Sequence, residues 1–351
     1  MPDVATPPEA PCLSICIATF KRAAFIAETL ESIVAQLQPG VEIVIVDGAS
    51  PDETEAAVAP FVAQYTALRY YREAINSGVD ADFDKAVGYA RGDYCWLMTD
   101  DDLLLPGAVS RVIATLADRP DVIIVDAMVK DAVFATTIEP RRFRFSGTRH
   151  YRPDEGDRLL ADVGDALSFI GGTIVSRRFW LSRERRRFYG SLFIHVGTIF
   201  QLPSPKAVAI GEPLIAIRFG NAMWTSRSFE IWMFLWPKLI WGLPGYSSAA
   251  KTAVVPREPW REWRRVAIYR ASGAFARRDF DRFFGEVTGR SRLRLIALAL
   301  FPGHLLNVLV VAWLAHRARA YSTDLYTLVN ASRFASAASR AIARRLIQAG
   351  R

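Results

Sequence analysis

Short, largely apolar runs alternate in the N-terminal part of the chain with segments whose apolar residues recur at helical spacing. The apolar runs cover residues 13–18, 41–46, 68–72, 94–98 and 122–125. Runs of this length are typical of strands buried on both faces of a sheet. Helical spacing is found between them, at residues 26–37, 58–65, 83–90 and 106–116. Repeated β-α-β order predicts an α/β fold with a mostly parallel, doubly wound sheet.

Two further apolar stretches, at 167–175 and 212–218, predict additional strands of the same sheet. Beyond Asn221 the composition changes to helical segments rich in aromatic residues and arginine. We therefore expect three parts: a loose, Pro-rich tail at residues 1–11, an α/β domain at 12–222, and a helical region at 223–351.

The composition predicts a cytoplasmic protein. The 351 residues are 51% hydrophobic, which is enough for a large core. The three cysteines have no metal-ligand spacing, and we expect reduced thiols in the core. Residues 1–11 lack a basic start and an apolar stretch, so they do not resemble a signal peptide.

The net charge of +8 is concentrated near the C-terminus, where residues 287–351 hold ten arginines and one acid, Asp324. No nucleic-acid-binding motif is found, and the same segment is apolar, so a membrane surface is the expected partner. The apolar stretch 296–314 is interrupted by Pro302 and Gly303, which predicts two short helices lying in the interface of the cytoplasmic membrane. A second contact is predicted at Trp232, Met233, Phe234, Leu235, Trp236 and Trp241, because aromatic residues favour that depth of the membrane. The alternative is an ordinary buried helical hairpin.

Asp100, Asp101 and Asp102 directly follow the buried run 94–98. Three carboxylates this close repel one another, and a divalent cation would relieve that repulsion. A solvated loop with an aspartate capping the next helix is the alternative interpretation.

Polar residues follow two other predicted strands in the same way: Thr19 to Arg22 follow the first, and Asp47 ends the second. Ligands of doubly wound sheets bind beyond the carboxyl ends of the strands. This convergence favours the metal-binding interpretation of the acidic cluster.

With these motifs assembled, the chain resembles the family 2 inverting glycosyltransferases of the GT-A fold. The resemblance rests on residues 13–22, 42–50 and 90–102, and covers roughly residues 12–220. Residues 76–85 and 94–97 are similar to the abequosyltransferase-like branch. The resemblance implies transfer of a sugar from a nucleotide-sugar donor to a lipid-linked saccharide in O-antigen or surface polysaccharide synthesis.

The resemblance also implies roles for individual residues. Metal ligands for Mg²⁺ or Mn²⁺ would be Asp102 and Asp100. Binding of the nucleotide sugar would involve Thr19, Arg22, Asp47, Asn76, Lys85, Asp100 and Asp101. Three of these have structural alternatives, since Thr19 could cap a helix, Asp47 could shape a turn, and Lys85 could be a solvated surface residue. Acceptor contacts would come from Arg218, Asn221 and Trp224.

The chain departs from the family pattern at the expected general base. The family usually has an acidic pair here, but residues 189–197 contain no carboxylate. His195 is the candidate base because imidazole has a suitable pKa. A buried packing role is its alternative, and Asp165 and Glu212 are the alternative bases.

Three other functions are alternatives. A sugar-nucleotide pyrophosphorylase should have a Gly-rich loop after its first strand, and a calcium-binding loop should space its acids differently, so the sequence disfavours both. A catalytically impaired relative that binds nucleotide or lipid stays open because the usual base is missing.

Overall fold

A computed structural model describes residues 11–221, 227–285, 287–318 and 322–348, so the predicted tail lies almost entirely outside the described residues. The chain forms two compact units. The first comprises Met1–Met128, Pro140–Ile217 and Gly242–Val254, and the second comprises Val129–Glu139, Arg218–Trp241 and Val255–Arg351. Each unit is therefore assembled from separated stretches of sequence.

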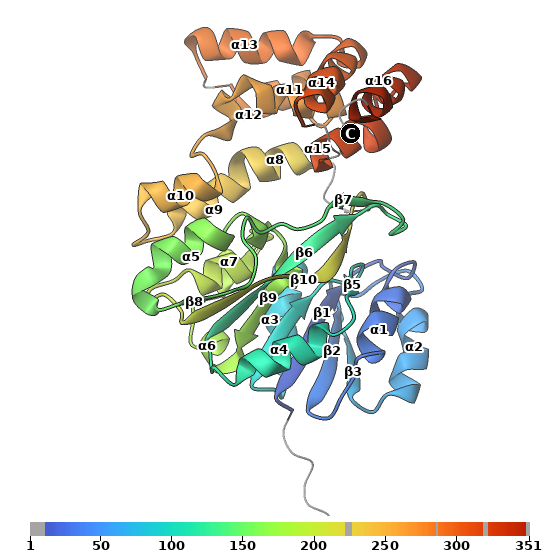
Figure 1. The fold of residues 1–351 in the computed structure, drawn as a ribbon, viewed down its shortest axis with the longest axis vertical. Coiled ribbons are helices and arrows are strands. Elements are labelled where there is room, and N and C mark those ends of the chain that lie inside the picture. Colours follow the sequence, from blue (N-terminus) through green and yellow to red (C-terminus); the bar gives the residue numbers. More distant parts are fainter. Residues whose placement is uncertain (1–10, 222–226, 286, 319–321, 349–351) are drawn as a thin grey trace, which may run out of the picture. The chain divides into compact units, whose positions relative to one another are not determined.

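A ten-stranded mixed sheet in the order β3-β2-β1-β4-β9-β6-β10-β5 organises the first unit (Figure 1). Strands β7 and β8 pair with β6 and β10. Pairing is parallel among β1 to β4 and antiparallel where β9 enters between β4 and β6. The strands are β1 Leu13–Thr19, β2 Val41–Asp47, β3 Leu68–Arg72, β4 Tyr94–Met98, β5 Leu103–Leu104, β6 Val122–Lys130, β7 Thr137–Glu139, β8 Thr148–Tyr151, β9 Thr173–Ser176 and β10 Ala207–Arg218.

Helices cover both faces of the sheet. Successive side chains of β1 and β2 point to opposite faces. Ile15, Ile17 and Ile43 share one apolar cluster with Ile26 of α1 and Val109 of α4. The alternate residues of β1 and β2 face the opposite side, where α3 packs. The helices of this unit are α1 Ile26–Val34, α2 Thr54–Gln64, α3 Val79–Tyr89, α4 Ala108–Leu116, α5 Gly156–Val163, α6 Arg177–Leu181, α7 Ile194–Ile199 and α10 Ser248–Val254. The predicted α/β class is thus confirmed, with a mixed sheet.

Two predicted strands have wrong boundaries. The stretch 167–175 is extended only from Thr173, because two 3₁₀ turns precede it. A Cβ at Gly172 would lie 2.9 Å from the carbonyl oxygen of Val125, so the chain passes β6 too closely for a regular strand with side chains. The second stretch, 212–218, is the last part of β10, which begins at Ala207 and continues through Pro213.

The second unit contains the predicted helical region except residues 242–254, which belong to the first unit, and it has apolar clusters of its own. One is aromatic and is built around Phe229, Phe275, Phe280 and Phe284. The second joins α11, α14, α16 and the π-helical turn after α15. Its helices include α8 Ser228–Glu230, α9 Trp236–Gly242 at the junction with the first unit, α11 Trp263–Ser272, α12 Arg277–Phe283, α13 Gly289–Leu300, α14 Gly303–Ala318, α15 Thr323–Tyr326 and α16 Ala337–Gln348.

Within the described residues, no single helix has both the length and the apolar composition needed to cross a bilayer. The pair Gly289–Leu300 and Gly303–Arg317 meets that test only together, and it is bent by 105°. The expected second contact at 232–236 is wrong in part, because Met233 and Trp236 are each only 3% exposed.

Candidate active site

The carboxyl ends of β1, β2 and β4 meet at one edge of the sheet. Because β1 pairs in parallel with both neighbours, Thr19 lies opposite Asp47 and Ile17 lies opposite Met98. The acidic triplet, Asp100 to Asp102, begins two residues after β4 ends. The structure therefore brings the three polar strand ends together.

The acidic triplet is almost buried, and its residues are 9%, 8% and 2% exposed in chain order. Nε of Arg22 lies 3.3 Å from Oδ1 of Asp100, and its Nη2 lies 3.2 Å from Oδ2 of Asp101. The hydroxyl of Thr99 donates a hydrogen bond to Asp102. Burial raises the pKa of Asp100 to about 7, and the negative charge of Asp101 adds to the shift. A further positive charge would therefore be favourable here.

The acidic triplet fits a divalent cation that completes its shell with substrate. Among the described residues, no group of three or more His, Cys, Asp and Glu side chains is arranged to hold a metal ion by itself, so a cation here would depend on substrate and water for its other ligands. Mg²⁺ commonly uses one or two carboxylates and fills its other positions with phosphate oxygens and water. The donor set here consists of carboxylate oxygens, which hard cations prefer, and the raised pKa of Asp100 shows that uncompensated negative charge is unfavourable at this position.

Asp47 is fully buried, and it shapes the turn that follows β2. Its Oδ1 accepts a hydrogen bond from the backbone N–H of Ser50 at 2.7 Å, and its Oδ2 accepts one from the Tyr70 hydroxyl at 2.5 Å. Burial and the Asp47 carboxylate raise the pKa of Tyr70. Each carboxylate oxygen can accept a second hydrogen bond. The hydrogen bonds of the turn therefore do not use up the capacity of Asp47 to accept one from a nucleotide base.

A charged network lies beside the Asp47 turn. Nζ of Lys85 lies 2.7 Å from Oε2 of Glu73 and donates to the Ser77 hydroxyl at 2.7 Å, so it is not a free surface lysine. Asn76 is exposed, and its Oδ1 accepts a hydrogen bond from the backbone N–H of Gly78 at 2.8 Å. Asn76 and Lys85 therefore have protein partners of their own.

Asp82 belongs to the same network and was missed by sequence reasoning. It is 3% exposed, and burial raises its pKa. A Cβ added to Gly48 would lie only 2.6 Å from its Oδ2, so the glycine lets this carboxylate approach the turn after β2. A glycine directly after the strand-ending Asp47 is the signal that could have suggested this close approach.

His195 lies on α7 and is fully buried. Its Nε2 lies 2.7 Å from the carbonyl oxygen of Leu167, whereas its Nδ1 has no hydrogen-bond partner. Burial lowers the pKa of His195 to about 4, so the ring is neutral at physiological pH. Asp80, also missed from sequence, holds the start of this segment by accepting hydrogen bonds from the backbone N–H groups of Leu192 and Ile194 at 2.8 and 3.0 Å.

The two alternative bases lie in different surroundings. Asp165 is exposed, two residues before the Leu167 carbonyl that contacts His195. Glu212 is exposed on β10, where its Oε2 lies 3.7 Å from Nε of Arg111. Of these two, Asp165 is the one adjacent in sequence to the His195 contact.

The expected acceptor residues are only partly described. Arg218 ends β10 and belongs to the second unit, where its Nη1 donates to the carbonyl oxygen of Ala132 at 2.6 Å. Its guanidinium also lies 4.2 Å from the centre of the Phe134 ring. Asn221 is partly buried, and Trp224 lies outside the described residues.

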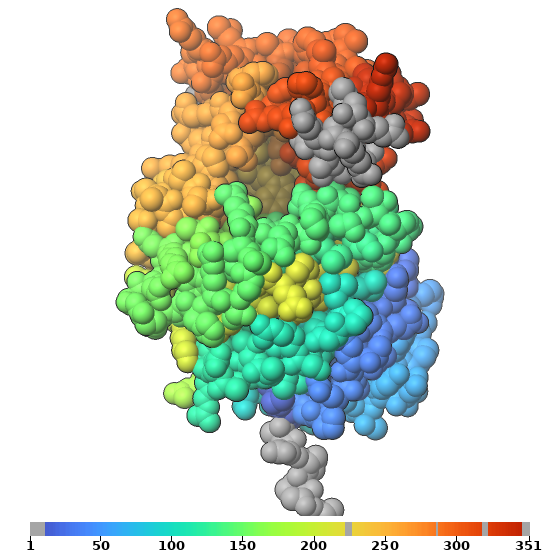
Figure 2. All heavy atoms as spheres, viewed as in Figure 1, coloured from blue at the N-terminus to red at the C-terminus, as the bar shows by residue number. Residues whose placement is uncertain are grey.

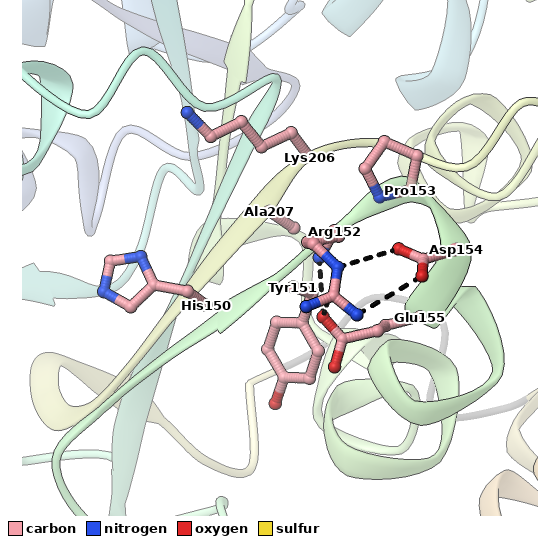
Figure 3. Close-up of a pocket in the computed structure, with 8 residues that line it drawn as sticks. All are labelled: His150, Tyr151, Arg152, Pro153, Asp154, Glu155, Lys206 and Ala207. Atoms are coloured by element: carbon pink, nitrogen blue, oxygen red, sulfur yellow. Dashed lines mark hydrogen bonds and ion pairs between the residues drawn. The ribbon is translucent and has the colours of Figure 1, made fainter.

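A shallow pocket of about 480 Å³ lies away from the strand ends described above. It is lined by β8 and the turn that leads into α5 (Figure 3), where Arg152 pairs with Asp154 and Glu155. Ala207, the first residue of β10, borders this pocket, and the preceding Lys206 bonds through its carbonyl to the N–H of Val122 at the start of β6. The pocket therefore lies near strand starts and not at the candidate active site.

Residues 14–184 match the family whose description is glycosyl transferase family 2. The chain carries a family 2 glycosyltransferase domain. Abequosyltransferase RfbV of Salmonella typhimurium is 27% identical over 223 residues, which are 60% of this chain and 67% of that protein. A Campylobacter jejuni GalNAc(5)-diNAcBac-PP-undecaprenol beta-1,3-glucosyltransferase is 27% identical over 29% of this chain and only 33% of its own length.

Solved structures share the fold of this glycosyltransferase. S. aureus TarS 1–349 in complex with UDP matches with a TM-score of 0.52 at 13% identity, over 96% of this chain and 89% of that one. Mannosyltransferase PcManGT from Pyrobaculum calidifontis, in complex with GDP-Man and Mn²⁺, matches with a TM-score of 0.52 at 16% identity, over 97% and 90% of the two chains. The predicted GT-A fold is therefore confirmed.

Proposed function

We propose that this glycosyltransferase moves a sugar from a nucleotide-sugar donor to a hydroxyl of a saccharide acceptor, with inversion at the anomeric carbon. The observation that carries the proposal is the nearly buried acidic triplet at the strand edge shared with Thr19 and Asp47. Within a family 2 domain, this edge is where a ligand of the sheet would bind.

The donor would bind over the carboxyl ends of β1, β2 and β4. Asp47 would accept a hydrogen bond from the nucleotide base and would keep its hydrogen bonds within the turn after β2. Arg22 would keep Asp100 and Asp101 in position and face the donor. The full set proposed for nucleotide-sugar binding is Thr19, Arg22, Asp47, Asn76, Lys85, Asp100 and Asp101.

Asp102 and Asp100 would hold Mg²⁺ or Mn²⁺. Such an ion, when bound, neutralises negative charge on the diphosphate leaving group. The protein's part is to present carboxylate oxygens from one rigid strand end, with Arg22 fixing the neighbouring acids. The Mn²⁺ in the Pyrobaculum calidifontis complex supports a divalent cation for this fold.

His195 would accept the proton of the attacking acceptor hydroxyl, because its ring is unprotonated and its Nδ1 has no hydrogen-bond partner. Burial makes the ring a weaker base, since it lowers the pKa of His195, and exposure to solvent would reverse that shift. Because His195 is completely buried, the exposed Asp165 is the first alternative for the general base, and Glu212 is the third candidate. A buried base would require the α7 segment to open when the acceptor binds.

The acceptor would be a lipid-linked saccharide in bacterial O-antigen or surface polysaccharide synthesis. The name of the Campylobacter relative, which prints an undecaprenol-linked saccharide, supports this class of acceptor. Arg218, Asn221 and Trp224 are proposed to contact it, as a cation, an amide and a sugar-stacking ring. The enzyme would lie peripherally on the inner face of the cytoplasmic membrane, without a nucleic-acid partner.

Thermal-shift measurements with UDP, CDP, GDP and dTDP, each with and without Mn²⁺, test donor binding. One nucleotide should raise the melting temperature, and more so with Mn²⁺, because a ligand stabilises the state that it binds. Transfer or hydrolysis of the matching nucleotide sugar should follow. Stabilisation without any turnover would indicate an impaired nucleotide-binding relative, whereas no response to any nucleotide would contradict the proposal.

A further inference from the structure

Helices α13 and α14 expose six large apolar side chains within 21 residues. On α13, Leu293 and Leu300 are 68% and 56% exposed, and Phe301 in the turn is 39% exposed. On α14, Leu305, Leu309 and Trp313 follow at intervals of four residues, with exposures of 59%, 58% and 38%. Intervals of four and of seven residues both return to the same side of a helix, so each helix presents an apolar stripe. Phe301 lies in the turn between the two helices, and we name these six exposed residues the apolar face.

The opposite side of α14 is anchored in the second unit. Val310, Val311 and Ala315 belong to an apolar cluster with α11 and α16. Asn307 is fully buried, and its Nδ2 donates to the carbonyl oxygens of Ala271 and Leu328 at 3.2 and 3.0 Å. Rotation of α14 to bury the stripe would break these contacts. The apolar face is thus a fixed feature of a packed helix, and α13 forms part of the surface in Figure 2 (orange).

The segment that carries the apolar face is basic and contains no acid. Residues 289–318 contain four arginines and neither Asp nor Glu. Arg290, Arg294 and Arg317 are exposed. Arg292 instead points inward and donates to the backbone carbonyls of Phe284, Gly285 and Val287. Three exposed cations therefore lie on the two helices that carry the apolar stripes.

Two tryptophans mark one end of the face. The guanidinium of Arg264 lies 5.6 Å from the ring centre of Trp263 and 6.0 Å from that of Trp313. Trp263 is 52% exposed. Indole rings favour the headgroup depth of a bilayer, and arginine beside them pairs with lipid phosphate.

We propose that the apolar face of α13 and α14 inserts into the surface of an anionic lipid bilayer, with Arg290, Arg294 and Arg317 on its phosphates. This inference deepens the proposed function, because it identifies the surface that would bring the enzyme to a lipid-linked acceptor. Charge complementarity selects this occupant. A second copy of the chain would bring the same arginines against one another, whereas anionic lipid offers the opposite charge.

Vesicle co-sedimentation of the full chain tests the proposal. The protein should bind vesicles of mixed phosphatidylglycerol and phosphatidylcholine, and bind phosphatidylcholine alone much more weakly. The double variant Leu305→Ser with Leu309→Ser should weaken binding at least about tenfold, because partitioning follows the apolar area inserted. Leu181→Ser, which changes a leucine 41% exposed on α6, is the matched control and should bind like the wild type.

A second variant pair, Arg294→Ser with Arg317→Ser, should lose binding to anionic vesicles and its salt dependence together. Nucleotide-induced stabilisation, measured without lipid, should be unchanged in both double variants, which separates this inference from the donor site. Unchanged vesicle binding in the leucine variant would overturn the proposal. So would a wild-type dimer that the same variant converts to a monomer, since the face would then join two copies.

Discussion

Asp102 is the residue whose charge should matter most to turnover. Asp102→Asn keeps the shape of the side chain and the Thr99 contact but removes the charge that is proposed to bind the metal. Loss of transition-state stabilisation at a metal ligand should lower the transfer rate by about a thousandfold or more. Relief of repulsion in the acidic triplet should leave the melting temperature equal or slightly higher.

The measurement is the initial rate of transfer with saturating donor and Mn²⁺, and the same loss should follow treatment of the wild type with EDTA. Asp154→Asn changes an exposed acid in the pocket of Figure 3 and serves as the control. Full activity of Asp102→Asn, or of the wild type in EDTA, would contradict the metal assignment.

His195→Ala distinguishes a base from a packing residue. Removal of a general base commonly lowers turnover about a hundred- to ten-thousandfold. Nucleotide binding, followed by thermal shift, should be nearly unchanged. Because the ring is fully buried, the variant should also lose stability, so rates are compared well below its melting temperature. Turnover within a few-fold of the wild type would assign His195 to packing and direct the search to Asp165→Asn.

The same histidine makes folding stability depend on pH. Burial lowers the pKa of His195 from 6.5 to about 4. Between these values the unfolded chain binds a proton that the folded chain does not, so the free energy of unfolding falls as pH drops from 6.5 toward 4. The full difference is about 3 kcal/mol.

Urea unfolding at pH 7 and pH 4.5 measures this effect. His195→Gln should reduce the difference between the two pH values. His150→Gln, at an exposed histidine, should leave the difference as in the wild type. An equal pH dependence in both variants would contradict the assignment of the effect to His195.

The junction of α3 with β4 depends on Gly92. A Cβ there would lie 2.6 Å from Oγ of Ser14 and 2.8 Å from its backbone nitrogen, at the start of β1. Gly92→Ala should therefore destabilise the protein by about 1–3 kcal/mol through overpacking. Gly88, on α3, has open space at its Cβ position, so Gly88→Ala should stabilise by roughly 0.5–1 kcal/mol. Chemical denaturation of both variants measures the change in the free energy of unfolding, which should have opposite signs in the two.

Strands and helices could be predicted from sequence where the local pattern determines them. Strands β1, β2 and β4 coincide to within one residue with largely apolar runs, and α1 and α4 follow helical spacing. The stretch before β9 could not be predicted in this way. Its 3₁₀ turns are fixed by distant partners, such as the Trp96 Nε1 that donates to the Gly171 carbonyl oxygen at 2.7 Å.

The sequence predicted the candidate site only in part, because the order of the strands shows which strand ends lie close together and nothing finer. Thr19, Asp47 and the acidic triplet converge because parallel strands end at one edge. The pairing of Arg22 with two of the acids depends on side-chain packing between loops that local pattern does not specify. The same limit applies to Asp80 and Asp82, which appear in sequence as polar residues on a helix yet are each 3% exposed.

Truncation after Gly289 is expected to damage the second unit instead of releasing a soluble enzyme. Leu295 and Ala299 of α13 pack in the aromatic cluster with Phe229 and Phe280. Their removal would expose those rings, and exposed aromatic surface favours aggregation. The truncated chain should therefore show a lower soluble yield than the intact double variant Leu305→Ser with Leu309→Ser. A truncated chain that is soluble and melts cooperatively would contradict this expectation.

The first unit also contains α10, from a late stretch of the sequence. The backbone N–H of Ser247 donates to Asp157 at 2.9 Å, and the Tyr246 hydroxyl lies 3.0 Å from that of Ser204. During synthesis the ribosome completes the sheet at Arg218, yet these partners emerge only with residues 242–254. A nascent chain of that length contains every strand of the sheet but lacks the residues that contact Asp157 and Ser204. The order of translation thus allows the strand edge with the acidic triplet to form before the first unit is complete.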